Sequence, residues 1–157
     1  MKTSIGITQS NLSEVAKALN VLLADEHVLY IKTRKAHWNV VGPDFLTMHE
    51  FFENQYKQIE KMIDDLAERI RTIGHYAEGT LDGFLKLTTL TEKGYAKNDS
   101  QGFMKVLLED HESIIIHIRE KIERIGEDLK DEGSADFITG LMKEHEKMAW
   151  MLRAHLG

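Results

Sequence analysis

Five potential metal ligands lie between positions 37 and 68 of this 157-residue chain. His49 and Glu53 are four residues apart, as are Asp64 and Glu68, so each pair projects from one face of a helix. The step from Glu53 to Asp64 turns a helix by about 1100°, which places both pairs on one stripe. The fifth ligand is His37. Imidazole and carboxylate donors suit Fe(II), Mn(II) or Zn(II), so the spacing predicts a transition-metal site.

One straight helix cannot bring both pairs to the same ion, because they lie about 16.5 Å apart along its axis. Two copies can do so if the helix packs antiparallel against its twin about a two-fold axis near Gln58 or Ile59. The predicted site then takes two histidines and Glu53 from one chain, with Asp64 and Glu68 from the other. His37 precedes the Gly42-Pro43 turn and is expected to fold back beside His49.

The donors define the chemistry that we expect. Three carboxylates balance one divalent ion and part of a second, so two iron ions per site are compatible with the charge. Fe(II) bound with an open position can be oxidised by hydrogen peroxide or dioxygen, and anionic oxygen ligands favour the Fe(III) product. Trp38 follows His37 directly, and we expect it either to pack on the site or to donate an electron there.

Other interpretations of these residues fit the sequence less well. A single helical carboxylate is usually a solvated charge, whereas two pairs in phase argue for a shared site. A zinc hydrolase is disfavoured because Glu53 stands where a His-Glu-x-x-His protease needs its second histidine. An intrasubunit di-iron centre needs Glu-x-x-His, which the sequence lacks. The remaining histidines are predicted to be surface or structural residues: His27, His75, His111, His117, His145 and His155.

Few breakers interrupt the chain, which has a single proline, Pro43. Apolar periodicity predicts four long helices, over about 11–38, 45–73 and 99–126 and from about 134 onward, with Asn11 as a capping residue and a short helix at 80–85. The first and last connections are short, and the middle one has about two dozen residues. These lengths predict an all-α, ferritin-like four-helix bundle with one long crossover, formed by a single domain over 1–157.

Composition narrows the function further. The chain has no cysteine, which excludes thiolate zinc sites, iron–sulfur clusters and cysteine nucleophiles. It has no leader-like segment and no run long enough to cross a membrane, so we expect a cytoplasmic protein. The net charge of −6 disfavours nucleic-acid and anionic-membrane partners unless a local basic patch exists.

The ligand spacing also carries a family resemblance. The motifs that carry it are His37-Trp38-Asn39, His49-Glu50-x-x-Glu53-x-x-Tyr56 and Asp64-x-x-Ala67-Glu68-Arg69-Ile70. Together they resemble the Dps family, the ferritin-like DNA-binding proteins from starved cells. The similarity covers nearly the whole chain, including Thr80-Leu81-x-x-Phe84-Leu85 and Trp150-Met151-Leu152.

The resemblance implies a hollow dodecamer with ferroxidase centres at its two-fold interfaces. Members oxidise Fe(II), typically with hydrogen peroxide, and store ferric mineral, which limits oxidative stress. The five ligand positions transfer one by one, with zinc or manganese as substitutes for iron. Glu53 departs from the aspartate that the family often has, so its longer side chain is expected to shift occupancy between two iron positions.

Two further features of the family concern an acidic cluster and a basic tail. An acidic cluster between Glu127 and Asp136 matches the family's iron-entry pores, with Asp131 and Asp136 as the candidate lining residues. DNA-coating members carry a Lys/Arg-rich tail, whereas here only Lys2 precedes Lys17. A dodecamer of subunits at −6 each would be repelled by phosphate, so we expect no appreciable DNA binding. A nucleoid-coating protein is therefore the alternative function and the less favoured one.

Overall fold

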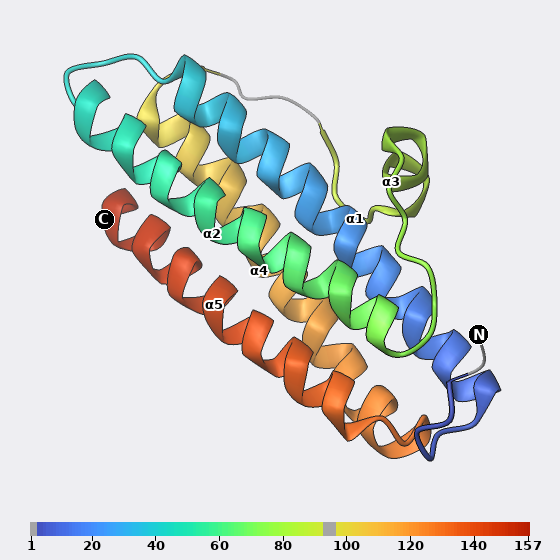
Figure 1. Cartoon of the computed structure of the whole chain (residues 1–157). Helices are drawn as coiled ribbons and strands as arrows, with labels where there is room; N and C mark the ends of the chain where they lie inside the picture. Colours follow the sequence, from blue (N-terminus) through green and yellow to red (C-terminus); the bar gives the residue numbers. More distant parts are fainter. Residues whose placement is uncertain (1–2, 93–96) are drawn as a thin grey trace.

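Four long helices account for most of the chain in the computed structural model, which describes residues 3–92 and 97–157 (Figure 1). Lys2 lies outside the described residues. The elements are α1 (Gln9–Asn39), α2 (Phe45–Thr72), α3 (Leu81–Leu87), α4 (Ser100–Glu123), the π-helix η1 (Arg124–Asp128) and α5 (Glu132–Leu156). The described residues include no β-strand. The predicted fold class, a four-helix bundle with a crossover that contains a short helix, is confirmed.

The helix termini follow local signals. Thr8 caps α1, because its hydroxyl accepts a hydrogen bond from the Asn11 backbone N–H at 3.2 Å. The prediction that Asn11 is the cap was therefore wrong: its side chain instead donates to the Leu129 carbonyl at 2.9 Å. Gly74 adopts a left-handed φ of 91° directly after α2, the conformation that ends many helices and that glycine adopts without strain.

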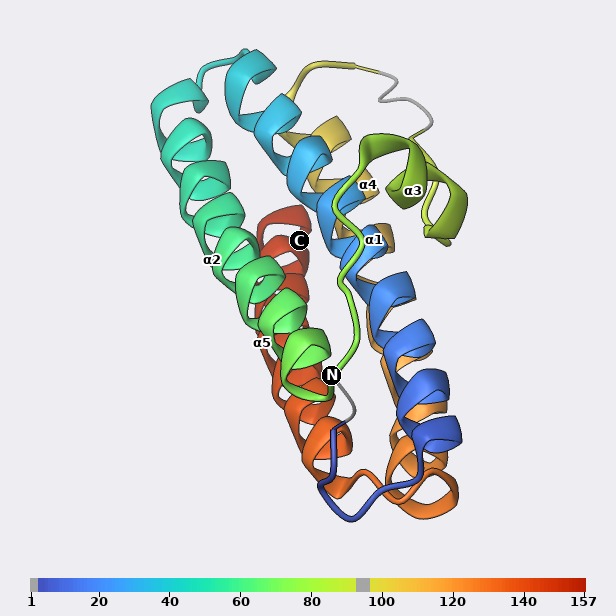
Figure 2. The same ribbon diagram turned by 45° about the vertical axis from the view of Figure 1, so that its right-hand side comes forward.

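The bundle has a fixed order of neighbours. α1 packs against α2 and α4, and α5 packs against α4 and α2, so α1 and α5 occupy opposite corners (Figure 2). Large apolar side chains from all four helices fill the centre, among them Leu19, Phe52, Ile59, Phe103 and Ile138, each fully buried. Burying such side chains supplies most of the stability of helices in proteins.

The crossover is fastened to α1 by buried charges. The Asp25 carboxylate accepts hydrogen bonds from the Thr89 backbone N–H at 2.6 Å and from the Thr88 hydroxyl at 2.7 Å. Lys32 donates to the Thr91 carbonyl at 2.9 Å and pairs with Asp110 of α4 at 2.5 Å. These bonds satisfy polar groups that burial would otherwise penalise, and they hold residues 88–91 over the α1–α4 face.

The α4–α5 connection differs from the prediction in detail. A single helix to Gly126 was expected, whereas α4 ends at Glu123 and the chain continues as the π-helix η1. α5 begins at Glu132, two residues before the predicted start, because Asp131 caps it by accepting from the Ser134 backbone N–H at 2.9 Å. No helix within residues 3–92 and 97–157 has the length and apolar character to cross a membrane.

Candidate metal centre

His37, near the end of α1, and His49, in α2, are linked by two hydrogen bonds, each from the ring of one residue to the backbone carbonyl of the other. His37 Nδ1 lies 2.8 Å from the His49 carbonyl oxygen, and His49 Nδ1 lies 2.9 Å from the His37 carbonyl oxygen. The two rings stack with centroids 3.8 Å apart. A carbonyl only accepts, so each Nδ1 carries a hydrogen, and in the neutral form of each ring Nε2 is then the nitrogen with the lone pair. This is the tautomer and support that a metal-binding histidine requires.

The turn between α1 and α2 sets this pairing. Gly42 adopts a φ of 141° and Pro43 follows it, which reverses the chain within a few residues. The Val41 backbone N–H donates to the Asn98 carbonyl at 2.9 Å, and the Ser100 hydroxyl donates to Asp44 at 2.6 Å. Contacts with the start of α4 therefore fix the turn that brings the two histidines together. The sequence predicted that His37 lies beside His49, but not these contacts.

Glu53 lies one helical turn beyond His49. Its carboxylate is ion-paired with Lys57 at 2.5 Å and remains about one-third exposed. The pKa of Glu53 is lowered, first by the hydrogen bond and charge of Lys57 and to a smaller degree by the two nearby histidines. Glu53 is therefore an ionised oxygen donor that is paired with an exposed lysine, and a metal ion can compete with this lysine for the carboxylate.

Asp64 and Glu68 lie further along α2, and both side chains are exposed. Lys61 pairs with Asp65 at 2.5 Å, and its pKa is raised first by that contact, with smaller contributions from the charges of Asp64 and Glu68. The described part of one chain contains no group of three or more His, Asp or Glu side chains arranged to hold a metal ion. The structure thus brings His37 beside His49, whereas Asp64 and Glu68 stay apart from them within one chain.

An arginine lies among aromatic rings beside the histidines. The Arg34 guanidinium is 5.0 Å from the Trp38 ring, 4.8 Å from the Tyr56 ring and within 2.6 Å of the Tyr30 hydroxyl, to which it donates. The Tyr56 ring meets His37 edge-on at 5.3 Å. Trp38 therefore packs on Arg34 and is 59% exposed, while Tyr56 contacts His37 directly. The sequence did not predict a role for Arg34 or Tyr56. The spacing of four between Tyr30, Arg34 and Trp38 nevertheless indicates that Arg34 contacts Tyr30 and Trp38.

The two candidate pore residues differ in their surroundings. Asp131 is 2% exposed, and its carboxylate accepts from Arg69 at 3.0 Å and from the Ser134 hydroxyl at 2.6 Å. Asp136 is exposed on α5. Asp131 therefore has a structural role as a cap and ion-pair partner, and only Asp136 has a solvent-facing carboxylate. A pore formed by several chains stays a prediction for both residues.

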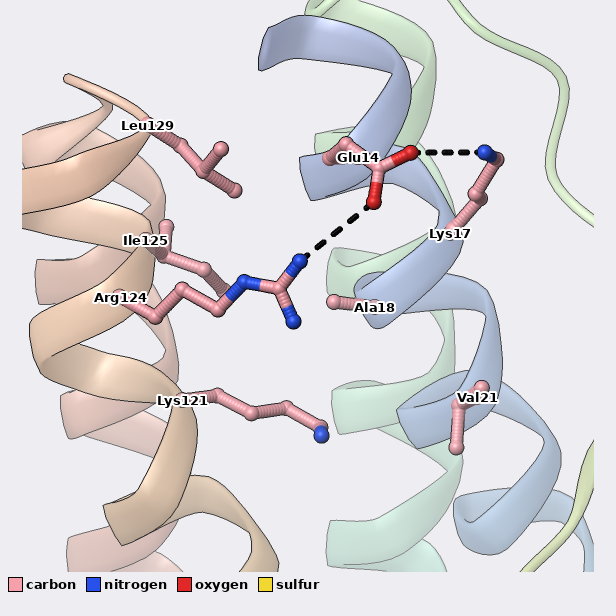
Figure 3. A pocket seen from close by; sticks show the side chains of 8 residues that line it. All are labelled: Glu14, Lys17, Ala18, Val21, Lys121, Arg124, Ile125 and Leu129. Atoms are coloured by element: carbon pink, nitrogen blue, oxygen red, sulfur yellow. Dashed lines mark hydrogen bonds and ion pairs between the residues drawn. The ribbon is translucent and has the colours of Figure 1, made fainter.

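Cations also line a small cavity of about 180 Å³ between α1 and the end of α4 (Figure 3). Lys17, Lys121 and Arg124 surround it above an aliphatic floor. Glu14 lies between two of these cations, 2.7 Å from Lys17 and 3.5 Å from Arg124. One carboxylate thus offsets part of the charge, and the cavity is a modest basic patch on an acidic chain.

Comparisons with known proteins agree with this architecture. A ferritin-like domain model matches residues 16–157. A low-temperature-induced protein of Nostoc is 43% identical over 99% of this chain and 87% of its own length. DNA protection during starvation protein 2 of Bacillus anthracis is 36% identical, over 91% of this chain and 97% of that protein. The fold and these matches define a ferritin-like protein.

Solved structures narrow the class further. A Dps protein of Vibrio cholerae, described as a member of a superfamily of ferritin-like diiron-carboxylate proteins, superposes with a TM-score of 0.92. It is 32% identical, and the alignment covers 100% of this chain and 98% of the Vibrio chain. The chain belongs to the Dps family.

Proposed function

We propose that this protein is a ferroxidase and iron-storage protein whose metal sites form between two copies of the chain. The observation that carries the proposal is the reciprocal bonding of His37 and His49, which uses Nδ1 of each of two stacked rings and leaves each Nε2 available as a ligand. A bundle core needs no such arrangement, whereas a metal ligand does. The diiron-carboxylate class of the Vibrio relative supports iron as the metal, and zinc or manganese would compete for the same donors.

The half-site explains why an oligomer is required. His37, His49 and Glu53 supply neutral nitrogens and one carboxylate, and the exposed Asp64 and Glu68 lie too far along α2 to join them in one chain. A two-fold axis near the middle of α2 brings the partner subunit's Asp64 and Glu68 to this half-site and makes two equivalent centres. We propose a dodecamer built from such dimers, each chain forming a single domain, in the cytoplasm.

The residues divide the chemistry between them. The histidines bind Fe(II) without adding charge, and the carboxylates stabilise the additional positive charge that oxidation creates. Two Fe(II) ions lose one electron each, and hydrogen peroxide takes both electrons with two protons to give two water molecules. Oxidation by peroxide without release of a radical is the step that protects against oxidative stress. Dioxygen is the second candidate oxidant.

DNA protection appears in the names of several relatives, including those of Bacillus anthracis and Helicobacter pylori. For this chain a net charge of −6 opposes binding to phosphate, and the cavity beside Arg124 is partly neutralised by Glu14. We propose that iron oxidation is the principal function. A gel shift with duplex DNA at physiological salt and without divalent ions is expected to show free DNA, and retarded DNA would overturn this choice.

A crystal soaked anaerobically with Fe(II) tests the whole proposal. We expect anomalous scattering between Nε2 of His37, Nε2 of His49, Glu53 and the partner subunit's Glu68. Iron bound to Asp64 and Glu68 with no histidine ligand from a second chain would show that the proposed ligand set is wrong. The same data would show whether Glu53, which is longer than aspartate, holds one or two ions.

A further inference from the structure

Three buried side chains form a hydrogen-bonded chain through the centre of the bundle. His145 Nε2 of α5 lies 2.6 Å from Glu26 Oε1 of α1, and His145 Nδ1 lies 2.9 Å from His111 Nδ1 of α4. Each of the three is at most 1% exposed. We call Glu26, His145 and His111 the core triad. It connects α1 to α5, which occupy opposite corners of the bundle, and it takes no part in the candidate metal centre.

Within the described part of the chain, no charged side chain from outside the triad hydrogen-bonds to it. α2 faces the core without a titratable side chain, since its buried residues are Met48, Phe52, Gln55, Ile59, Met62, Leu66 and Ile70. On α1 and α4, Asp25 bonds to the crossover and Lys32 pairs with Asp110. Glu112, Glu144 and Glu146 are adjacent to the two histidines in sequence and are not buried, and His117 lies 4.0 Å from Asp25. Among the carboxylates of the described residues, Glu26 alone hydrogen-bonds to the histidine pair.

The geometry limits how many protons the histidines hold. Two ring nitrogens 2.9 Å apart have room for one hydrogen between them, so one Nδ1 must donate and the other must accept. His145 Nε2 donates to Glu26, which balances one extra positive charge on the pair. A second extra proton would place two N–H groups against each other and a second cation in an apolar core.

We propose that the core triad is a proton-sharing device that links α1, α4 and α5 while the histidine pair carries at most one extra proton, and that opens the bundle when acid adds a second. His111 is the residue that resists charging. Its Nε2 has no hydrogen-bond partner among residues 3–92 and 97–157, and burial, followed by the proximity of His145, lowers the pKa of His111 well below its usual range.

A metal site does not explain these residues. Nε2 of His145 faces Glu26, and its Nδ1 faces His111, so the ring uses opposite edges for its two partners. No three donors converge on one point in the described part of the chain. The ligand that the triad shares is therefore a proton.

The test compares the acid sensitivity of the folded protein with that of His111→Gln, which keeps an amide for His145 but does not titrate. Because the unfolded state binds a proton at position 111 that the folded state excludes, stability falls as pH drops below about 6.5. Between about pH 6.5 and 5, we expect the unfolding equilibrium constant of the wild type to rise about tenfold more per pH unit than that of the variant. Urea unfolding followed by circular dichroism measures both slopes.

His75→Gln, at a partly exposed position after α2, is the matched control and is expected to keep the wild-type slope. Equal slopes for the wild type and His111→Gln would overturn the proposal. If His111→Gln does not fold, hydrogen–deuterium exchange at the histidine C2 carbons of the wild type decides the question. The exchange midpoint of His111 must then lie at lower pH than that of His75, and coincident midpoints would also refute the device.

Discussion

Lys57 Nζ lies 2.5 Å from Glu53 Oε1, so an ammonium group is paired with the carboxylate of the half-site. A metal ion must displace this ammonium group to bind Glu53. Solvent and salt screen exposed pairs spaced four apart, so such pairs are weak and Lys57→Gln is expected to tighten metal binding only about twofold. Zn(II) titration by calorimetry measures the change without oxidation of the metal.

Lys17→Gln is the matched control for this change, because Lys17 also pairs with a glutamate on its own helix but lies near the far end of α1. It should leave the zinc affinity unchanged. An equal effect of both variants would indicate a general charge effect, and weaker binding by Lys57→Gln would mean that Lys57 supports the site.

The histidine pair is expected to be essential for iron oxidation. His37→Ala combined with His49→Ala removes both Nε2 donors, so the rate of ferric absorbance growth after Fe(II) and peroxide are mixed should fall at least about tenfold, towards the rate without protein. His75→Ala combined with His155→Ala removes one partly exposed and one exposed histidine outside the half-site and should oxidise iron at the normal rate. Wild-type oxidation by an intact oligomer of the first variant would show that the metal binds elsewhere.

Complementation between two inactive variants tests the shared site directly. One variant carries the two histidine substitutions, and the other carries Asp64→Asn and Glu68→Gln. When the two are refolded together, a mixed dimer regains one complete centre of its two, so random pairing restores about a quarter of the wild-type activity. Native mass spectrometry confirms mixing. Mixed oligomers that stay inactive would exclude ligands from two chains.

Much of the half-site could be predicted because its residues lie on two consecutive helices. The positions from His37 to Glu68 are related by helical periodicity and one tight turn, and both are local properties of the sequence. Pro43 and Gly74 bracket α2, so its ends were predicted to within a residue.

The core triad could not be found in the same way. Glu26 and His145 are 119 positions apart, and His145 and His111 are 34 apart, on three different helices. Their contact depends on the position of α5 relative to α1 along the bundle axis, which periodicity does not determine. Each of the two histidines, taken alone, was predicted to be a surface or structural residue, and both are buried.

The buried pair of Lys32 and Asp110 should make the stability of the bundle depend on pH once it is broken. Lys32→Met leaves the Asp110 carboxylate without its cation in a buried place, which costs about 3–5 kcal/mol of unfolding free energy near neutral pH. Burial already raises the pKa of Asp110, and Lys32 opposes that shift. Without Lys32 the folded-state pKa rises further above its unfolded value, so the folded state binds a proton that the unfolded state lacks. The variant should therefore recover stability as the pH falls through this raised pKa towards the unfolded value.

Adding Asp110→Leu to Lys32→Met should restore most of the loss at neutral pH and remove the pH dependence. Urea unfolding at two pH values measures both effects, and a loss from Lys32→Met that does not change with pH would mean that the crossover contact to Thr91, and not the charge on Asp110, carries the cost.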